Sequence, residues 1–227
     1  MSERTVLVTG STGGLGPTVV DAFATGGWRV VSTSRTAGTG TVAATGTTAI
    51  RADLTDPDQV NEVVATATAD PAAPLRAVVN LVGGYRGTGA IHETPIDDFE
   101  QMMRINLRPT YLTTRAALPH LVEAGGGSVV CVSSRAALVP FAGAAGYVTA
   151  KAAVLAFAAA VAVEYRAAGV RCNTVVPAMI DTPANRRSQP DADHANWVRP
   201  AEIAPVIVFL AGPQSAPTSG AVVPVYG

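Results

Sequence analysis

The chain has little charge and few aromatic side chains. Charged residues make up 15% of its 227 residues and aromatic residues 5%, and the formal net charge is −1 at pH 7. Proteins that bind nucleic acid usually display a basic face, and this sequence has neither such a face nor a charged tail. A nucleic-acid partner is therefore not expected. A globular protein is expected, because 48% of the residues are hydrophobic.

Metal ligands, cysteines and targeting segments are also scarce. His92, His120 and His194 lie far apart without metal-site spacing, so we expect no metal. Cys131 and Cys172 lie in valine-rich runs, where buried structural thiols are expected rather than a disulfide or a nucleophile. The N-terminus lacks a signal-peptide pattern, and the most apolar stretches are broken by Gly, Pro or charge before membrane length. We expect a cytoplasmic protein that does not enter a membrane.

Short β-branched runs alternate with longer Ala-rich helical patterns. Most of the runs are continuously apolar, which is typical of parallel strands covered on both faces. This alternation predicts right-handed crossovers and a single-domain, Rossmann-like α/β fold over residues 1–227, a doubly wound parallel seven-stranded sheet with helices on both faces. The expected strands are Thr5–Thr9, Arg29–Ser34, Thr48–Arg51, Ala77–Val82, Ser128–Ser133, Val170–Val175 and Ala221–Val225.

Prolines and capping residues mark where the helices should begin and break. Asp56-Pro57-Asp58-Gln59 has the order of an N-cap, a first-turn proline and a capping-box glutamine. The helical pattern Asp98–Glu123 contains Pro109, which should kink or interrupt it. Further helices are expected at Tyr147–Ala167 and Ala201–Leu210.

The longest polar stretch, Ala178–Asn196, is expected to be a substrate lid. Pro183 and Pro190 argue against a long regular helix in it. Long loops in compact domains are usually functional or mobile, so we expect an open site or a lid that is disordered without ligand. The Gly/Thr-rich segment Thr36–Thr47 is a second expected loop.

A glycine-rich loop lies between the first strand and the first helix. Its sequence is Gly10-Ser11-Thr12-Gly13-Gly14-Leu15-Gly16, and Pro17 fits the first helical turn. Glycines let the backbone approach a phosphate, and the N-terminus of the following helix offers unpaired N–H groups to an anion. Since no Gly-Lys-Ser/Thr follows, the loop indicates dinucleotide binding rather than a P-loop nucleotidase.

The end of the second strand indicates which dinucleotide binds. An NAD-specific site usually places a carboxylate there to bind the ribose hydroxyls. This strand ends instead in Ser34 and is followed by Arg35, whose guanidinium suits a 2′-phosphate. We therefore expect NADP(H) to be preferred over NAD(H).

Tyr147 and Lys151 stand four residues apart, on one helical face. A nearby cation favours the phenolate, which suits a phenol to proton exchange with an alcohol or ketone oxygen. Ser133 and Ser134 end a predicted parallel strand, and ligands of such sheets sit at the carboxyl ends of strands.

These motifs, in this order, resemble the short-chain dehydrogenase/reductase family nearly end to end. Ser134 lies thirteen residues before Tyr147, the family's spacing, which favours it over Ser133. The sequence departs from the family at Leu81, where a second Asn is usual, and at Ala178, where a Gly is usual. The resemblance implies the catalytic residues Asn106, Ser134, Tyr147 and Lys151. It also implies a cofactor site made of Gly10, Ser11, Thr12, Gly14, Leu15, Gly16, Ser34, Arg35, Asp53, Leu54, Asn80, Leu81, Val82, Tyr147, Lys151, Pro177 and Thr182.

The resemblance also implies how the site works. Ser134 would hydrogen-bond the substrate oxygen, and Tyr147 would deliver or remove the proton. Lys151 would hold the nicotinamide ribose and lower the pKa of Tyr147, while Asn106 would kink its helix and hold a water that links Lys151 to solvent. The expected reaction is hydride transfer between NADP(H) and a carbonyl or secondary alcohol, as in a ketone or aldehyde reductase. A catalytically silent NAD(P)-binding regulatory or scaffold protein of the same fold is the alternative.

The substrate is expected to be a small molecule whose identity the sequence does not contain. Arg86 or Arg135 could pair with an anionic group on it, and Tyr85 could pack against its ring or chain; both arginines could equally be solvated loop residues. The resemblance further implies that Asp98–Glu123 and Tyr147–Ala167 pair across a two-fold axis in a homodimer or homotetramer. The apolar C-terminal stretch Ala221–Gly227 is expected to be docked rather than frayed.

Overall fold

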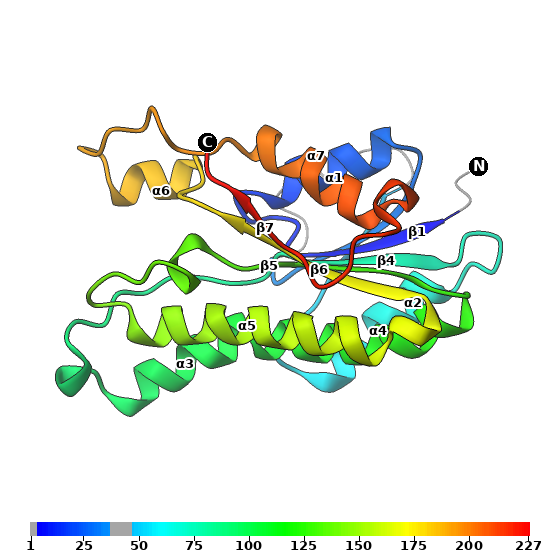
Figure 1. Ribbon diagram of the computed structural model, residues 1–227, viewed down its shortest axis with the longest axis horizontal. Helices are drawn as coiled ribbons and strands as arrows, with labels where there is room; N and C mark the ends of the chain where they lie inside the picture. Colours follow the sequence, from blue (N-terminus) through cyan, green and yellow to red (C-terminus); the bar gives the residue numbers. More distant parts are fainter. Residues whose placement is uncertain (1–3, 37–46) are drawn as a thin grey trace.

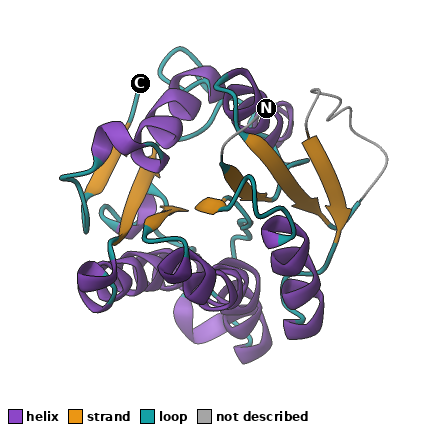
Figure 2. Ribbon diagram, turned by 90° about the vertical axis from the view of Figure 1, so that its right-hand side faces the viewer, coloured by secondary structure: helices purple, strands orange, loops and turns teal. Residues whose placement is uncertain are grey.

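Seven parallel strands form one sheet between two layers of helices (Figures 1 and 2). The computed structural model describes residues 4–36 and 47–227. The strand order of the sheet is β3-β2-β1-β4-β5-β6-β7, and it reverses direction between β1 and β4, as in a doubly wound fold. The strands are β1 Thr5–Thr9, β2 Arg29–Ser34, β3 Thr47–Arg51, β4 Leu75–Asn80, β5 Gly127–Val132, β6 Val170–Pro177 and β7 Val222–Val225. The α-helices are α1 Gly16–Thr25, α2 Pro57–Thr68, α3 Ile96–Asn106, α4 Arg108–Glu123, α5 Ala145–Glu164, α6 Pro183–Ser188 and α7 Pro200–Ala211.

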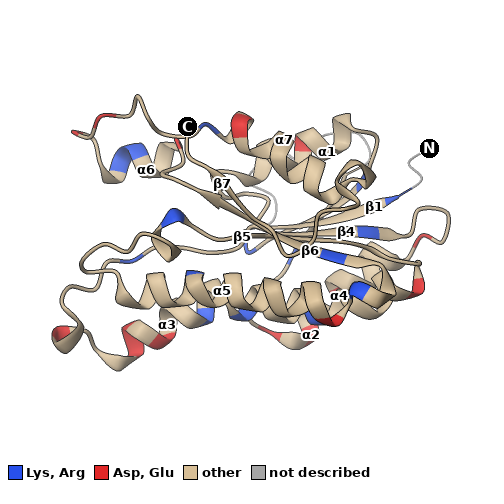
Figure 3. Ribbon diagram, viewed as in Figure 1, with Lys and Arg blue, Asp and Glu red and all other residues tan. Residues whose placement is uncertain are grey.

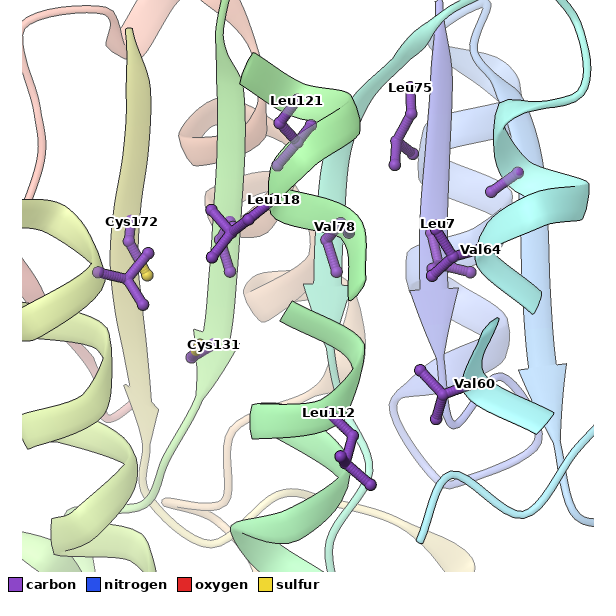
Figure 4. Close-up of a cluster of buried hydrophobic side chains, with 14 of the residues drawn as sticks. Leu7, Val60, Val64, Leu75, Val78, Leu112, Leu118, Leu121, Cys131 and Cys172 are labelled. Atoms are coloured by element: carbon purple, nitrogen blue, oxygen red, sulfur yellow. The ribbon is translucent and has the colours of Figure 1, made fainter. Parts of the chain in front are cut away.

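All seven predicted strands are present, and the predicted fold class is confirmed. Both faces of the sheet are covered, which explains the continuously apolar runs: Val6, Leu7 and Val8 of β1 are all fully buried. One core packs the sheet against α2, α4 and α5, and Figure 4 shows its side chains. The other core lies between the sheet and helices α1 and α7. The cysteines predicted to be structural thiols, Cys131 and Cys172, are free and buried in the first core.

The strand ends differ from the predictions by up to two residues. β4 is the clearest case, since it begins at Leu75 and ends at Asn80. Leu81 and Val82 were expected to continue it, but both follow the strand and remain partly buried against the two cores. Apolar residues thus extend past the sheet because the turn after β4 is itself packed.

The interruption predicted from Pro109 lies between α3 and α4. Helix α3 ends at Asn106 and α4 begins at Arg108, with Leu107 between them. Proline has no N–H to donate, but the first turn of a helix needs none, so Pro109 can start α4 although it cannot continue α3. This break fixes Asn106 at the end of a helix.

Helix α5 is the core helix of the lower layer in Figure 1. Over its 20 residues it is long and apolar enough to cross a membrane by length and composition, although Gly146 and the charged Lys151 interrupt its apolar run, as expected from the sequence. Its buried residues include Ala150, Val154 and Ala158, which belong to the core against the sheet. A helix packed in the centre of a protein reaches such hydropathy without a membrane.

The expected lid, residues 178–196, follows β6 and leads towards α7. It contains only the six-residue helix α6, as its prolines predicted. A parallel bridge joins Ile180 to Val198, and the Asp181 carboxylate accepts a hydrogen bond from Arg186 at 2.8 Å. Most of the loop expected at Thr36–Thr47 lies outside the described residues.

Charged side chains are distributed over both helical layers (Figure 3). In this view of the described residues, no face carries one sign of charge throughout. The C-terminal stretch is part of the fold, because β7 pairs with β6 from Val222 to Val225. The carboxyl ends of the strands and helix α6 lie together on the left of Figure 1, where the candidate site is found.

Candidate functional site

The glycine loop joins β1 to α1 at the carboxyl edge of the sheet. Ser11 anchors it, because both its N–H and its hydroxyl donate to the carbonyl of Thr33 in β2, at 2.9 and 3.1 Å. A Cβ on Gly16 would overlap the backbone of Gly10 and Ser11, so the turn requires glycine there. Within the described part of the chain, three loop amides make no backbone hydrogen bond: those of Thr12, Gly14 and Leu15.

Thr182 lies directly over this loop. Its side chain is buried, and its methyl group occupies the space that a Cβ on Gly14 would need. Its hydroxyl accepts a hydrogen bond from the N–H of Asn185 at 3.1 Å and so caps α6. Pro177 ends β6 five residues earlier, so the predicted Pro177–Thr182 segment runs from the sheet to the glycine loop.

Asn80 ends β4 beside the loop. Its amide nitrogen donates to the Thr114 hydroxyl at 3.0 Å, while its Oδ1 is buried without a partner among the described residues. The N–H of Leu81 donates to the Thr9 hydroxyl at 3.0 Å, which holds the turn after β4 against β1. A buried acceptor without a donor is costly, so this Oδ1 fits a ligand that brings an N–H or O–H group.

Asp53 and Arg35 lie at the outer end of the same edge. The Asp53 carboxylate accepts two hydrogen bonds from Thr55, both of 2.9 Å. These bonds lower the pKa of Asp53, and the nearby positive charge of Arg35 lowers it further. Leu54 is buried, and its side chain packs in the core beneath this edge of the sheet.

Arg51 was missed in the sequence. It ends β3 opposite Ser34 in the register of the parallel pair, which brings a second arginine to the end of β2. The signal was available, because Ser34 and Arg51 both end predicted adjacent strands. The structure thus gathers a hydroxyl and two arginines where a 2′-phosphate is expected.

Asn106 fixes the loop after β4. Its side chain is fully buried; Oδ1 accepts from the N–H of Gly84 at 3.1 Å, and Nδ2 donates to the carbonyl of Gly84 at 2.9 Å and to that of Met102 at 3.0 Å. An amide that pairs with both backbone groups of one residue holds that residue in place. Asn106 therefore positions the segment that borders the Tyr147–Lys151 pair.

The two adjacent serines have different surroundings. The Ser133 hydroxyl is buried and donates to the Lys151 carbonyl at 2.8 Å, which ties β5 to α5. The Ser134 hydroxyl accepts from the N–H of Ala136 at 3.2 Å, and the nearness of this side chain to Tyr147 lowers the pKa of the phenol. Burial outweighs this effect, so the pKa of Tyr147 is raised above its ordinary value.

Lys151 is the only lysine in the chain. Its ammonium is buried and donates to the Val132 carbonyl at 3.1 Å. Burial lowers the pKa of Lys151 to about 8, against which the nearby Cys131 acts weakly. Lys151 is not among the groups that shift the pKa of Tyr147 here, and the lowering of that pKa by Lys151 stays a prediction.

Gly83 was not among the predicted site residues, although it ends the Asn80–Gly83 stretch that resembles the family's strand end. A Cβ on it would lie 2.7 Å from Asn106 Oδ1 and 2.9 Å from Lys151 Nζ. Those two side chains therefore flank one backbone position that only glycine leaves open. Its place directly after the Asn80-Leu81-Val82 strand end was the available signal.

The two arginines that were considered as partners of an anionic substrate have different contacts. Arg86 forms an ion pair with Asp98 at 2.9 Å, whereas Arg135 lies over the ring of Tyr226, 5.1 Å from its centroid. Tyr85 packs edge-on against Tyr147 with ring centroids 5.2 Å apart. Among residues 4–36 and 47–227, no group of three or more His, Cys, Asp or Glu side chains could hold a metal.

A hollow of about 850 Å³ lies elsewhere. It lies on the outer side of α3, α4 and α5 and is lined by residues such as Tyr111 and Phe157, with no member of the Asn106–Ser134–Tyr147–Lys151 set. The chemistry is therefore placed by the residues at the strand ends and not by the size of a hollow.

Several known proteins that resemble this chain in sequence are dehydrogenases. Residues 4–193 match the family described as short chain dehydrogenase. The 2-(R)-hydroxypropyl-CoM dehydrogenase of Xanthobacter autotrophicus is 34% identical over 96% of this chain and 95% of its own length. The cyclic-di-GMP-binding biofilm dispersal mediator protein of Escherichia coli is 29% identical over 96% and 93% of the two lengths. The structure of ElxO with NADP bound superimposes with a TM-score of 0.90, at 25% identity over 98% of this chain and 97% of that one.

The family match covers most of the chain, one relative is 34% identical, and a solved structure has the same fold. The chain belongs to the short-chain dehydrogenase/reductase family, whose members use NAD(P) and act on alcohol or carbonyl groups.

Proposed function

We propose that the protein transfers hydride between NADP(H) and a ketone or aldehyde, or the corresponding alcohol, with Tyr147 as acid and base. The observation that carries the proposal is the nearness of the Ser134 side chain to the Tyr147 phenol at the carboxyl edge, one helical turn before the buried Lys151. Two hydroxyls that lie close together can both bond to a single substrate oxygen.

The proton steps follow from the surroundings of the phenol. The raised pKa of Tyr147 keeps it protonated at neutral pH, which suits proton donation during reduction. Ser134 donates to the substrate oxygen and holds it beside the phenol. In oxidation the deprotonated form of Tyr147, the phenolate, would take the alcohol proton instead. A nicotinamide held at this edge would supply the hydride chemistry.

The residues present fit such a cofactor. The free amides of Thr12, Gly14 and Leu15 at the start of α1 suit a pyrophosphate. The unpaired Asn80 Oδ1 suits a hydrogen-bond donor of the adenosine portion, and Thr182 and Lys151 border the nicotinamide end.

NADP(H) is proposed over NAD(H) on the basis of Ser34, Arg35 and Arg51. No carboxylate of the described residues occupies the end of β2, and a guanidinium binds a 2′-phosphate through paired hydrogen bonds. Arg35→Gln should lower kcat/KM for NADPH on the order of 10-fold or more and leave that for NADH unchanged. An equal loss with both cofactors would refute the preference.

The reaction itself is tested with a panel of ketones and aldehydes, using NADPH and NADH and following nicotinamide absorbance. Tyr147→Phe should reduce kcat by about 10²- to 10⁴-fold, because it removes the proton and keeps the ring. The matched control is Tyr111→Phe, a half-exposed tyrosine of α4, which should retain full activity. Near-wild-type turnover in Tyr147→Phe would refute the role of the phenol.

A catalytically silent nucleotide-binding protein is the second candidate, and the E. coli relative named for binding cyclic-di-GMP favours it. A binder has no need to keep Asn106, Ser134, Tyr147 and Lys151 together, and this chain has all four. If the protein binds NADPH yet reduces no member of the panel, this candidate replaces the first.

We further propose a cytoplasmic homodimer or homotetramer built on the outer side of α4 and α5. The hollow there exposes Tyr111 beside Phe157, with rings 5.7 Å apart, and holds both acidic and basic side chains such as Glu100 and Arg108. A surface of mixed charge around aromatic residues can complement its own copy across a two-fold axis. A monomeric mass in solution at micromolar concentration would exclude this assembly.

A further inference from the structure

Two arginines lie near the reactive hydroxyls, and only one has a carboxylate partner. Arg86 pairs with Asp98 at 2.9 Å, so its charge is compensated. Arg135 directly follows Ser134, is exposed, and forms no ion pair within the described part of the chain. The uncompensated positive charge is therefore the one beside the serine that faces Tyr147.

The guanidinium of Arg135 packs on an aromatic ring, and its N–H donors remain free. It lies 5.1 Å from the ring centroid of Tyr226, which follows β7, and makes no hydrogen bond to the described residues. A guanidinium that stacks on an aromatic ring keeps its N–H donors free and loses less conformational freedom when it binds. The paired N–H donors of the guanidinium match the two oxygens of a carboxylate or a similar oxyanion.

An apolar surface borders the phenol of Tyr147. Tyr85 and Phe141 have ring centroids 5.9 Å apart, and their side chains are 57% and 50% exposed. Tyr85 also contacts Tyr147 edge-on, which places this aromatic pair beside the reacting hydroxyl. Exposed aromatic rings next to a reactive group suit a substrate with a ring or a broad apolar chain.

We infer that the substrate is a carbonyl or alcohol compound that carries an anionic group, which Arg135 binds, and an apolar body, which packs on Tyr85 and Phe141. The inference rests on the proposed function, because Ser134 and Tyr147 must hold the carbonyl for Arg135 to reach the anion. Arg86 and Asp98 form the outer border of the site and contribute no charge to substrate binding.

The test compares matched acids and esters. With NADPH, kcat/KM is measured for 4-oxo-4-phenylbutanoate and its methyl ester, within a panel of ring ketones that each have an acid and an ester form. The wild-type protein should prefer the acids. Arg135→Gln should lower kcat/KM for the acids on the order of 10- to 100-fold, since one charge-assisted pair is lost, and leave the esters unchanged.

Arg86→Gln is the matched control and should change neither substrate form. Arg187→Gln, on α6, tests another arginine without a carboxylate partner in the described residues, and it should also have no effect. Added salt should weaken turnover of the acids more than that of the esters. Unchanged ester activity in Arg135→Gln shows that the variant is folded.

Three outcomes overturn the inference. The first is a wild-type preference for esters. The second is an equal loss of acid and ester activity in Arg135→Gln, and the third is the same acid-specific loss in Arg86→Gln or Arg187→Gln. If the protein binds NADPH but reduces neither acids, esters nor neutral aldehydes, the proposed function itself has failed, a result distinct from these three.

Discussion

The buried ammonium of Lys151 gives a prediction that can be measured at a single atom. Burial lowers its pKa from 10.5 to about 8. Because Lys151 is the only lysine, protein grown with ¹³C-labelled lysine shows one Cε resonance. We expect this resonance to titrate with a midpoint near pH 8 in the folded protein and near the ordinary lysine value in denaturant. A folded-state midpoint close to 10.5 would refute the argument.

The same shift has a consequence for stability. A difference between 10.5 and about 8 corresponds to about 3 kcal/mol, at about 1.4 kcal/mol for each pKa unit. The folded pKa is the lower one, so between pH 8 and 10.5 the unfolded chain binds more protons than the folded chain. Stability therefore rises with pH across this window, and the charged lysine destabilises the fold below it.

Lys151→Met removes this cost together with one hydrogen bond. The Val132 carbonyl loses its donor, which costs about 1 kcal/mol, so we expect the variant to be roughly 2 kcal/mol more stable than wild type at pH 7. Near pH 10.5 the advantage should vanish. Urea denaturation at both pH values measures the difference, and the variant should be inactive. A variant less stable at pH 7, or an advantage independent of pH, would contradict the desolvation argument.

Three further substitutions test the site. Gly83→Ala places a Cβ between Asn106 and Lys151 and should lower kcat at least 10-fold while thermal unfolding remains cooperative; full activity would show that the gap is not needed. Ser134→Ala should lower kcat on the order of 10²-fold with little change in stability. Ser133→Ala should do the reverse: it loses a buried bond to Lys151, costs about 1 kcal/mol in denaturation, and keeps most of the activity.

Much of the fold could be predicted because its signals are local. Continuous apolar runs mark strands covered on both faces; most of the seven predicted strands are such runs, and all seven strands are present. The break at Leu107 follows from Pro109 alone. The ends of β4 could not be placed, because Leu81 and Val82 are apolar for a different reason: they pack in a turn between the two cores.

The members of the candidate site could be predicted better than their electrostatics. Sequence spacing selects Ser134, Tyr147 and Lys151, and folding brings the first two close together. The direction of the Tyr147 pKa shift could not be predicted, since it depends first on how deeply the phenol is buried. Spacing also cannot show which of two loop arginines has a carboxylate neighbour, because Asp98 reaches Arg86 from another element.

Two costly features of this protein lie at one edge of the sheet, beside an arginine without a counter-ion. A charged lysine is buried and the Asn80 Oδ1 is buried without a donor, while the exposed Arg135 has no ion-pair partner among the described residues. The first two are unfavourable in the protein alone, and all three lie at the carboxyl end of β4 or β5, or on the helix that follows β5. Departures from stable packing that cluster in this way indicate a site selected for binding rather than stability. A dinucleotide and an anionic substrate would supply the hydrogen-bond donor and the counter-charge that these groups lack.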